Sequence, residues 1–354
     1  MDKLNSINIL ITGSGAPGIK GTIYSLRNNF DRRKVILIGT DIDSNAVGKF
    51  LCDKFFVIPP SKSKELYLKS LFSICKDEKV DVILPQNTFE LELLSKNVLM
   101  FKKIKTQIVI ASQNSINIAN DKFHLMNVCQ KIGVPVGSFY KVNTFDKLVK
   151  CAENLGWPAK NFVVKPPVSN GMRGVRIISE KINRKDLFYN EKPNSLYLTL
   201  NDLKQILGHK FPDLIVTEYL PGDEYTVDVF RSNNQIVVIP RIRHKIKSGI
   251  TFFGEVKKHD NIIKYCQLIS EELNLKNCYG FQFKLDQNGI PKILESNPRV
   301  QGSMILATLA NANIIYASIK QAMGEKIPKF KIKWGAKLIR YWGGVGVSDK
   351  IIDL

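Results

Sequence analysis

The sequence has 354 residues, 44% of them hydrophobic, and its 52 basic and 32 acidic residues give a formal net charge of +20. This length allows two or three compact units with ordinary cores. No apolar run approaches the roughly 20 residues of a membrane-spanning helix. The N-terminus leads straight into a strand, so we expect no signal peptide. Six scattered cysteines without a CxxC pair argue against a disulfide framework or a zinc site and favour a cytoplasmic protein.

The basic charge is typical of proteins that bind nucleic acid, anionic lipid or anionic metabolites. The lysines are spread along the whole chain, and no nucleic-acid motif is recognised. We therefore expect neither a nucleic-acid nor a membrane partner. A genome with biased codon usage explains the lysines, and a phosphate-rich ligand is the alternative explanation.

The N-terminal part alternates short apolar strands with helical patterns, which predicts a parallel α/β sheet over residues 1–113. Gly13 to Gly18 form a literal GxGxxG between a strand and a helix, and the next strand ends near Asp41 and Asp43. This context is the one that dinucleotide binding requires, so an NAD-dependent oxidoreductase is one hypothesis. Tight packing at a strand-to-helix turn also requires glycine, which is the structural alternative.

Two lysines in the middle of the chain are candidates for binding phosphate. Lys122 opens an amphipathic helix that ends at Gly133-Val134-Pro135. Lys165 ends the apolar strand that starts at Phe162, where an unpaired lysine is rare. The loop 168–175 follows, and its backbone N–H groups are suited to phosphates, although it is not a Walker loop. A solvated lysine and an ordinary hairpin loop are the alternatives.

The string ExxLPGxEYxVD runs from Glu218 to Asp228, between two predicted strands. The predicted strand 236–247 comes next, and its four odd-numbered cations (Arg241, Arg243, Lys245 and Lys247) are expected on one face. Such a row is either an anion-binding wall or a solvated edge strand that resists aggregation. The segment 180–212 contains one predicted helix near 200–207, and we assign it no function.

The stretch 278–303 predicts a β-hairpin with a polar face. Alternation from Phe281 to Leu285 indicates a strand, and Asn288-Gly289 indicates a two-residue turn. That turn places Gln282 directly opposite Glu295. Asn297 shares the face of Glu295, and Arg299 lies just beyond. Side-chain oxygens on a rigid hairpin suit Mg²⁺, although a polar surface hairpin explains the local pattern equally well.

The frame Q…ExNPR resembles the metal-binding end of the ATP-grasp superfamily. It is most similar to the ATP-grasp units of the carbamoyl-phosphate synthetase large subunit, where a Gln, a Glu and an Asn hold the metals. Other branches have a carboxylate where Gln282 stands. The resemblance implies a Rossmann-like domain (1–113), a small ATP-grasp subdomain or lid (114–185) and a large subdomain (186–354), an α/β and α+β architecture.

The resemblance also implies roles for single residues. The implied metal ligands are Gln282, Glu295 and Asn297. The implied catalytic cations are Lys122, Lys165 and Arg299, of which Arg299 stabilises the acyl phosphate and the oxyanion. The implied nucleotide-binding residues are Lys122, Lys165, Gly171, Gly174, Glu218, Tyr219, Leu220 and Glu224, where the hinge 218–220 lines the base and Glu224 holds the ribose.

The expected activity is an ADP-forming ligation of a carboxylate to an amine through an acyl phosphate, with ATP and Mg²⁺, or Mn²⁺ in its place. The expected partners are small-molecule carboxylates and amines, and a homodimer is the default assembly. The alternatives are the NAD-dependent oxidoreductase and an ATP-binding protein without catalysis.

Overall fold

The computed structural model describes residues 5–190, 195–347 and 351–353. The chain divides into two compact units, each made of separate stretches of sequence. The first unit comprises Met1–Asn120, Glu224–Phe283 and Glu295–Leu354. The second comprises Asp121–Asp223 and Lys284–Leu294. The boundaries at residues 113 and 185 that the sequence suggested stay a prediction.

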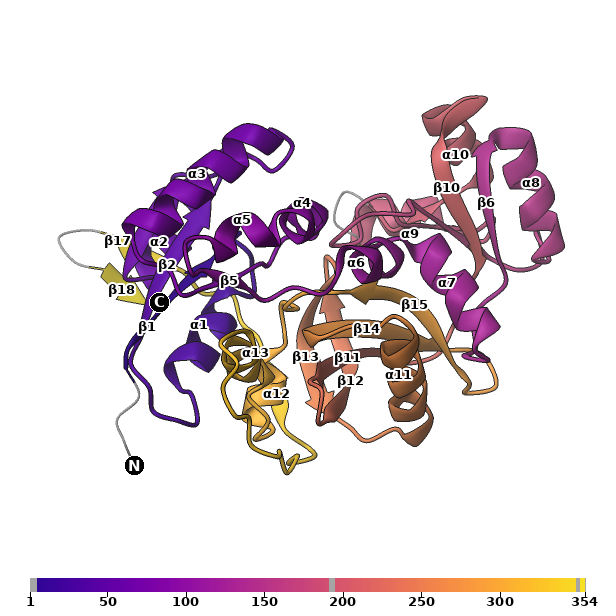
Figure 1. Ribbon diagram of the computed structural model, residues 1–354. Helices are drawn as coiled ribbons and strands as arrows, with labels where there is room; N and C mark the ends of the chain where they lie inside the picture. The colour runs from indigo at the N-terminus through magenta and orange to yellow at the C-terminus, as the bar shows by residue number, and fades with distance from the viewer. Residues whose placement is uncertain (1–4, 191–194, 348–350, 354) are drawn as a thin grey trace. The chain divides into compact units, whose positions relative to one another are not determined.

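The first unit begins with a parallel sheet, as the alternating pattern predicted (Figure 1). Its five strands lie in the order β3-β2-β1-β4-β5. Helices follow the strands, so the strands β1 and β4 are almost entirely buried, as is typical of parallel sheets. The elements are β1 (Ile7–Ile11), α1 (Ile19–Arg27), β2 (Val35–Asp41), α2 (Gly48–Leu51), β3 (Lys54–Val57), α3 (Lys64–Asp77), β4 (Val82–Leu84), η1 (Thr88–Glu90), α4 (Leu91–Lys96), α5 (Val98–Lys102), β5 (Gln107–Ile108) and α6 (Gln113–Asn120).

A six-stranded sheet in the order β15-β14-β11-β12-β13-β16 carries the other elements of interest. Strand β12 lies between β11 and β13, so its interpretation as an edge strand is wrong. The turn between β14 and β15, residues 284–294, belongs to the second unit. The elements are β11 (Glu224–Arg231), β12 (Ile236–Lys247), β13 (Ile250–Val256), α11 (Asp260–Glu272), β14 (Asn277–Leu285), β15 (Pro291–Asn297), α12 (Ile305–Leu309), α13 (Ile314–Ala322) and β16 (Lys337–Ile339).

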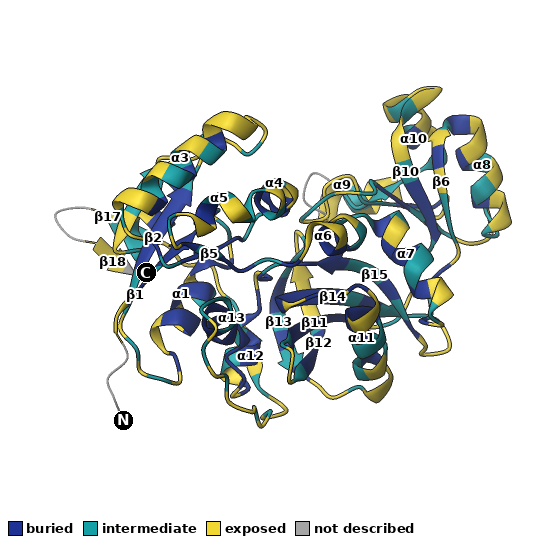
Figure 2. Cartoon of the chain, in the orientation of Figure 1, coloured by how far each residue is buried: buried dark blue, intermediate teal, exposed yellow. Residues whose placement is uncertain are grey.

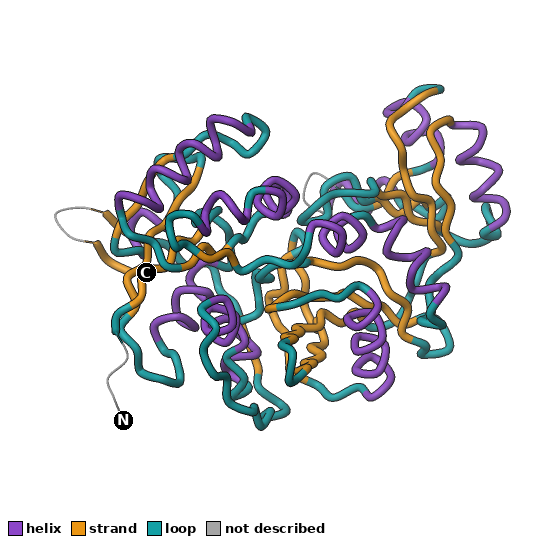
Figure 3. Tube along the Cα trace, in the orientation of Figure 1, coloured by secondary structure: helices purple, strands orange, loops and turns teal. Residues whose placement is uncertain are grey.

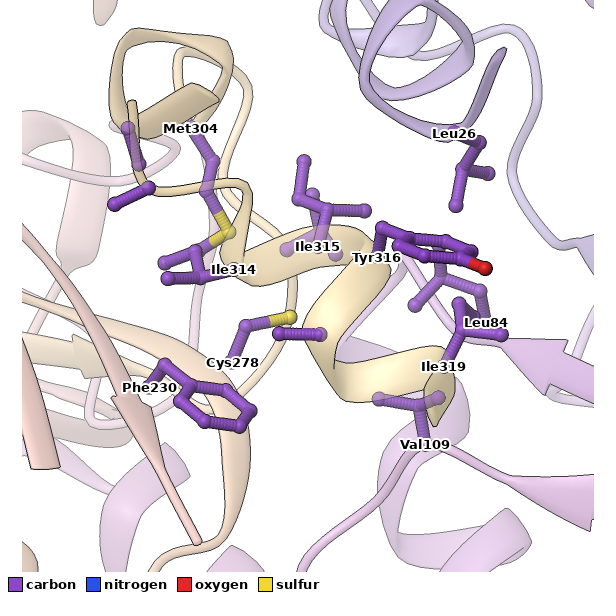
Figure 4. Packing of buried hydrophobic residues seen from close by; sticks show 14 of the residues in the cluster. Leu26, Leu84, Val109, Phe230, Cys278, Met304, Ile314, Ile315, Tyr316 and Ile319 are labelled. Atoms are coloured by element: carbon purple, nitrogen blue, oxygen red, sulfur yellow. The ribbon is translucent and has the colours of Figure 1, made fainter. Parts of the chain in front are cut away.

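Helix α13 joins the two sheets of the first unit through one apolar core (Figure 4). It contacts β4 of the parallel sheet and β11 of the six-stranded sheet. Ile315 and Ile319 of α13 pack in one cluster with Leu84 and Phe230, and none of these side chains is exposed by more than 1%. The parallel sheet and the six-stranded sheet are therefore held together by buried apolar surface within this unit.

The second unit is an α+β structure whose five-stranded sheet has the order β6-β10-β7-β8-β9. Helix α8 packs on β6 and β10, and Leu148 and Phe162 are fully buried in its core. The predicted helix near 200–207 is confirmed, and a capping box of Thr199 and Asp202 starts it. The elements are α7 (Lys122–Lys131), β6 (Phe139–Thr144), α8 (Phe145–Asn154), β7 (Phe162–Lys165), β8 (Arg176–Ile178), α9 (Arg184–Asn190), β9 (Tyr197–Leu198), α10 (Leu200–Leu207) and β10 (Lys210–Glu218).

Two features mark the C-terminal part of the chain. Residues 303–323 contain two short helices, α12 and α13, because Asn311 adopts a left-handed conformation with φ of 65° and separates them. Strand β16 ends at Ile339, and a separate antiparallel pair, β17 (Val345–Val347) with β18 (Ile351–Asp353), follows.

Helices α3 and α11 each show one buried and one exposed face (Figure 2). Among the described residues, every helix is too short or too polar to cross a membrane.

Candidate nucleotide and metal site

The C-terminal end of β15 brings three of the predicted site residues into one hydrogen-bonded chain. Asn297 Nδ2 donates to Glu295 Oε1 at 3.2 Å. Arg299 Nη2 donates to Asn297 Oδ1 at 3.1 Å. Alternation along the strand places Glu295 and Asn297 on one face, and the convergence of their oxygens on a metal stays a prediction. Gln282 lies on the neighbouring strand β14 and is half-buried.

The turn of this hairpin is drawn as a loop in Figure 3. Its hydrogen bonds differ from those of the predicted two-residue turn, and that prediction is wrong. Asp286 N–H donates to the Ile290 carbonyl at 3.0 Å, and Gly289 N–H donates to the Asp286 carbonyl at 3.1 Å. Residues 287–289 therefore form a three-residue loop, with Gly289 at φ of 75°. With this three-residue loop, the residue count no longer places Gln282 directly opposite Glu295. The part of Gln282 in metal binding stays a prediction.

Arg299 has a second set of contacts that the sequence did not indicate. Its Nε donates to Thr88 Oγ1 at 2.9 Å, so η1 of the N-terminal sheet helps to fix the guanidinium. Burial lowers the pKa of Arg299, and the carboxylates of Glu295 and Glu90 oppose this shift. An arginine remains charged under such shifts. A positioned cation thus lies beside the oxygens of Glu295 and Asn297.

Glu90 is itself a buried acid held by hydroxyl groups. Tyr67 donates to it at 2.6 Å, Thr12 donates to its other oxygen, and the Asn87 N–H donates at 2.9 Å. Burial raises the pKa of Glu90, whereas these hydrogen bonds lower it. The spacing Asn87 to Glu90 is that of a capping box, which is the only sequence signal that marked this position.

The predicted row of four cations on β12 is wrong. Register shifts between Arg243 and Ile246 interrupt the alternation. Arg241 is 1% exposed and forms a two-point ion pair with Asp228, with both nitrogen-to-oxygen distances at 2.7 Å. Arg241 Nη1 also donates to Ser303 Oγ at 2.7 Å, which supports the segment after Arg299. This strand is therefore no free anion-binding wall.

Glu224, the residue implied for the ribose, is engaged by β12. Arg243 Nη1 donates to Glu224 Oε1. Arg243 also donates to Thr251 Oγ1 at 2.9 Å and to the Gly249 carbonyl at 2.7 Å, so three partners hold its guanidinium. The carboxylate of Glu224 is thus oriented from its own sheet, and its contact with a ribose stays a prediction.

The GxGxxG motif has a structural explanation within the first unit. The Gly15 N–H donates to Asp41 Oδ2 at 2.7 Å, so the acid expected near a ribose caps the loop instead. A Cβ on Gly18 would lie 2.5 Å from the Cα of Gly302. Gly18 is the third glycine of the motif, the one that allows close packing of the helix. Its packing against Gly302 therefore explains this glycine without a dinucleotide, and dinucleotide binding stays a prediction.

The second unit holds both candidate phosphate-binding lysines, and both are buried. Lys122 is 3% exposed and Lys165 is 5% exposed. Lys122 Nζ donates to Ser169 Oγ at 3.2 Å, and its N–H donates to the Pro167 carbonyl at 2.9 Å, so it contacts the predicted lid loop. Lys165 Nζ donates to the Leu294 carbonyl at 3.2 Å. Buried lysines are rare unless they have partners, and these two meet neutral oxygens.

The lid loop itself needs glycine at both predicted positions. Gly171 has φ of 59° and Gly174 has φ of 75°, values that other residues rarely adopt. A Cβ on Gly174 would also lie 2.6 Å from Pro166 Cγ. The loop therefore approaches the end of β7 closely.

The predicted hinge residues lie at the end of β10. Glu218 accepts from Lys292 Nζ at 2.7 Å, and Leu220 is 6% exposed. Lys284 Nζ lies 5.6 Å from the ring centroid of Tyr219. No local pattern indicated these two lysines, because they lie on the hairpin, far from the hinge in the sequence.

Two family models match the chain. Residues 9–109 match the model described as PylC-like, N-terminal domain. Residues 210–338 match the model described as ATP-grasp in the biosynthetic pathway with Ter operon.

Curated relatives agree with these matches. A formate-dependent phosphoribosylglycinamide formyltransferase from Wolinella succinogenes is 23% identical over 94% of this chain and 80% of that protein. The carbamoyl phosphate synthase arginine-specific large chain of Halalkalibacterium halodurans is 22% identical over 92% of this chain. The large chain from Clostridium acetobutylicum is 18% identical over 75% of this chain. This chain spans only 30% and 24% of those two proteins.

Solved structures share the fold. The N5-carboxyaminoimidazole synthetase of Staphylococcus aureus, solved with ADP, superposes with a TM-score of 0.67 at 19% identity over 94% of this chain and 82% of that chain. The biotin carboxylase of Campylobacter jejuni superposes with a TM-score of 0.67 at 19% identity over 93% of this chain and 74% of that chain. The L-amino acid ligase of Bacillus licheniformis superposes with a TM-score of 0.62 at 12% identity over 91% and 75%.

The chain therefore carries an ATP-grasp domain, matched over residues 210–338, preceded by an α/β domain with a parallel sheet. It is homologous to the carbamoyl phosphate synthase large chain and has the fold of the N5-carboxyaminoimidazole synthetases.

The residues at the end of β15 fit a hard divalent cation. Glu295 and Asn297 offer a carboxylate and an amide oxygen, and an amide oxygen that accepts one hydrogen bond retains a second lone pair. Within the described part of the chain, no three His, Cys, Asp or Glu side chains gather as a metal cluster. Few protein ligands suit Mg²⁺, which usually takes one or two carboxylates and completes its shell with phosphates and water.

Proposed function

We propose that this protein is an ATP-dependent, ADP-forming ligase that joins a carboxylate to an amine through an acyl phosphate. The observation that carries the proposal is the hydrogen-bonded chain of Glu295, Asn297 and Arg299 at the end of β15, in a chain with an ATP-grasp domain. These three hydrogen-bonded side chains combine oxygen ligands for a metal with one positioned cation. Reactions of this class require both groups at a transferring phosphoryl group.

The reaction has two steps. A carboxylate oxygen of the substrate attacks the γ-phosphorus of ATP, forming one O–P bond and breaking the bond to ADP. The amine then attacks the carbonyl carbon of the acyl phosphate, and inorganic phosphate leaves with the C–O bond electrons. The amine loses one proton to phosphate or water, because no general base is evident near the described site residues.

Each site residue then has a stated task. Mg²⁺, held by Glu295 and Asn297 with Gln282 as the third predicted ligand, neutralises charge on the phosphates. Arg299 donates hydrogen bonds to the acyl phosphate and to the oxyanion that follows. Its hydrogen bonds to Thr88 and Asn297 fix its orientation before substrate arrives, which lowers the reorganisation that the reaction requires.

Lys122 and Lys165 bind the nucleotide phosphates as compact positive charges. Glu218, Tyr219 and Leu220 line the base, and the lid loop with Gly171 and Gly174 covers the phosphates.

Two other functions receive less support. The NAD-dependent oxidoreductase rests on a glycine motif whose Gly18 is explained by packing on Gly302 and whose Gly15 N–H is already paired with Asp41. An ATP-binding protein without catalysis does not require the ordered arginine beside two oxygen ligands. The solved structures that share this fold include an L-amino acid ligase, so amide formation is a chemistry that this fold accommodates.

The test is a search for carboxylate-dependent ADP release. The full chain is incubated with ATP, MgCl₂ and pooled carboxylates, and hydroxylamine replaces the unknown amine. An acyl phosphate intermediate gives a hydroxamate together with ADP and phosphate. A carboxylate labelled with ¹⁸O transfers one label to the released phosphate. Formation of AMP and pyrophosphate, or no nucleotide turnover with any carboxylate pool, rejects the proposal.

A matched pair of variants tests the metal assignment. Glu295→Gln keeps the size of the side chain but removes its charge, so we expect at least a hundredfold loss of turnover and a higher Mg²⁺ requirement. Glu92→Gln changes an exposed glutamate on α4, which pairs with Lys96 in the same helix, and leaves turnover unchanged. Turnover of Glu295→Gln within threefold of wild type refutes the role of Glu295.

A further inference from the structure

Lys292 lies beside the predicted base-binding hinge, residues 218–220. It lies on β15, and its ammonium group contacts two carboxylates of the second unit. Its Nζ lies 2.7 Å from Glu218 Oε1 and 3.5 Å from Asp286 Oδ2. The side chains of Lys292 and Glu218 are only 20% and 30% exposed, so water screens the pair incompletely. Lys292 therefore fixes the carboxylate of Glu218 at the end of β10.

The hinge is joined to the hairpin by backbone contacts as well. The Gly222 N–H donates to the Leu285 carbonyl at 3.0 Å, and the Leu285 N–H donates to the Asp223 carbonyl at 2.9 Å. These two bonds hold the chain after the hinge in place even without the ion pair. The pair of Lys292 with Glu218 is thus not needed to attach the hairpin. What it adds is a defined orientation and charge for one carboxylate.

The hydrogen-bonding groups of the two purines decide which one an oriented carboxylate favours. Adenine presents an amino group at C6, which donates, whereas guanine presents a carbonyl oxygen, which accepts. An ionised carboxylate only accepts, and an ammonium group only donates. Glu218 therefore favours adenine over guanine, while a free Lys292 would favour guanine. The ion pair occupies the ammonium group and orients the carboxylate.

We propose that Lys292 is the positioning residue for purine selection: by pairing with Glu218 and Asp286, it orients Glu218 as an acceptor for the adenine amino group and withholds its own donors from guanine. This inference rests on the proposed function, because it assumes that the hinge binds the nucleotide base. Lys292 acts through Glu218 and does not itself touch the adenine amino group.

The experiment compares ATP and GTP binding to the full chain by isothermal titration calorimetry in MgCl₂. Lys292→Met leaves Glu218 without its partner, and we expect about tenfold weaker ATP binding, the size of one charge-assisted hydrogen bond. Lys292→Arg restores the pair and recovers most of the affinity. Lys141→Met removes another lysine, paired with Asp213 at 3.4 Å in the same unit, and leaves both affinities unchanged.

The decisive variant exchanges the two charges. Glu218→Lys with Lys292→Glu rebuilds the ion pair in reverse, so the melting temperature returns close to that of wild type. The hinge now presents a donor, and the ratio of ATP to GTP affinity is expected to fall at least tenfold. Were the pair merely structural, the exchange would restore ATP preference, and that result overturns the inference.

The two proposals fail in different ways. Wild-type protein that binds neither nucleotide overturns the base-binding hinge and this inference together. Wild-type protein that binds ATP, with a Lys292→Met variant of equal affinity and equal selectivity, overturns only the inference.

Discussion

Replacing Arg241 by methionine should cost the first unit much of its stability. The substitution removes the guanidinium but keeps much of the apolar volume of the side chain. Asp228 is then left without a counterion at a position where 0% of it is exposed. Breaking a buried pair by removing one partner typically costs about 3–5 kcal/mol, a large part of the roughly 5–15 kcal/mol that stabilises a domain.

The contrast with the double variant separates the ion pair from general packing. Asp228→Leu with Arg241→Met replaces both charges by apolar groups of similar size. It should be less destabilised than Arg241→Met alone, because no buried charge remains uncompensated. Arg184→Met is the control: its pair with Asp202 has a side chain 67% exposed, so a loss of at most about 1 kcal/mol is expected.

The effect of pH on this pair has a defined sign. Burial raises the pKa of Asp228 to about 6, although Arg241 lowers it. A carboxyl group with a raised pKa binds protons more readily in the folded state. Proton binding by Asp228 therefore stabilises the folded state fully below the unfolded pKa of about 4. This contribution to the free energy of unfolding is lost as pH rises through about 6. Without Arg241 this pKa rises further, so Arg241→Met should be less destabilised at pH 5 than at pH 8.

Urea unfolding followed by tryptophan fluorescence at both pH values measures these free energies. The reasoning is refuted if Arg241→Met lowers the free energy of unfolding by less than 1 kcal/mol at pH 8. It is also refuted if the double variant is less stable than the single variant. A deficit that grows as the pH falls would contradict the sign of the pKa shift.

Two further predictions concern the surroundings of Arg299. Gly18→Ala places a Cβ 2.5 Å from the backbone of Gly302, so we expect the free energy of unfolding, measured in urea, to fall by about 1–3 kcal/mol. The control is Gly344→Ala, whose added Cβ meets no atom within 4 Å and should change the stability little. Equal stability of the two variants would contradict the packing argument. Thr88→Val removes the acceptor of Arg299 Nε, so kcat should fall about tenfold while the KM for ATP stays within twofold; a change in KM alone would contradict a role at the reacting carbonyl.

Much of the fold follows from patterns that are local in the sequence. The parallel sheet follows from strands and helices that alternate along the chain, and a capping box marks the start of α10 at Thr199. Lys165 was recognisable because it is a charged residue in an apolar strand, and it is buried, as is Lys122 at the start of its helix. Patterns of this kind depend on neighbours a few residues away, so they can be read without knowledge of strand pairing.

The misjudged features depend on partners that lie far away in the sequence. Alternation predicted four cations on one face of β12. Arg241 instead pairs with Asp228 on the neighbouring strand β11, and register shifts after Arg243 interrupt the alternation of the later residues. The hairpin turn illustrates a subtler conflict. Asn288-Gly289 indicates a two-residue turn, yet the Asp286 side chain accepts from the N–H groups of Asn288 and Ile290, both at 2.9 Å. This local competition favours the three-residue loop.

The segment after β15 gives the glycine motif of the first helix a structural reason that does not involve a dinucleotide. Arg299 is fixed by Thr88, Gly302 packs on Gly18, and Ser303 is held by the buried guanidinium of β12. A catalytic cation has to be held within a fraction of an ångström of its working position, and residues that support it are as necessary as the cation itself. The parallel sheet thus contributes to the proposed chemistry by supporting Arg299 through its loops, and its glycines are required because two backbones meet there.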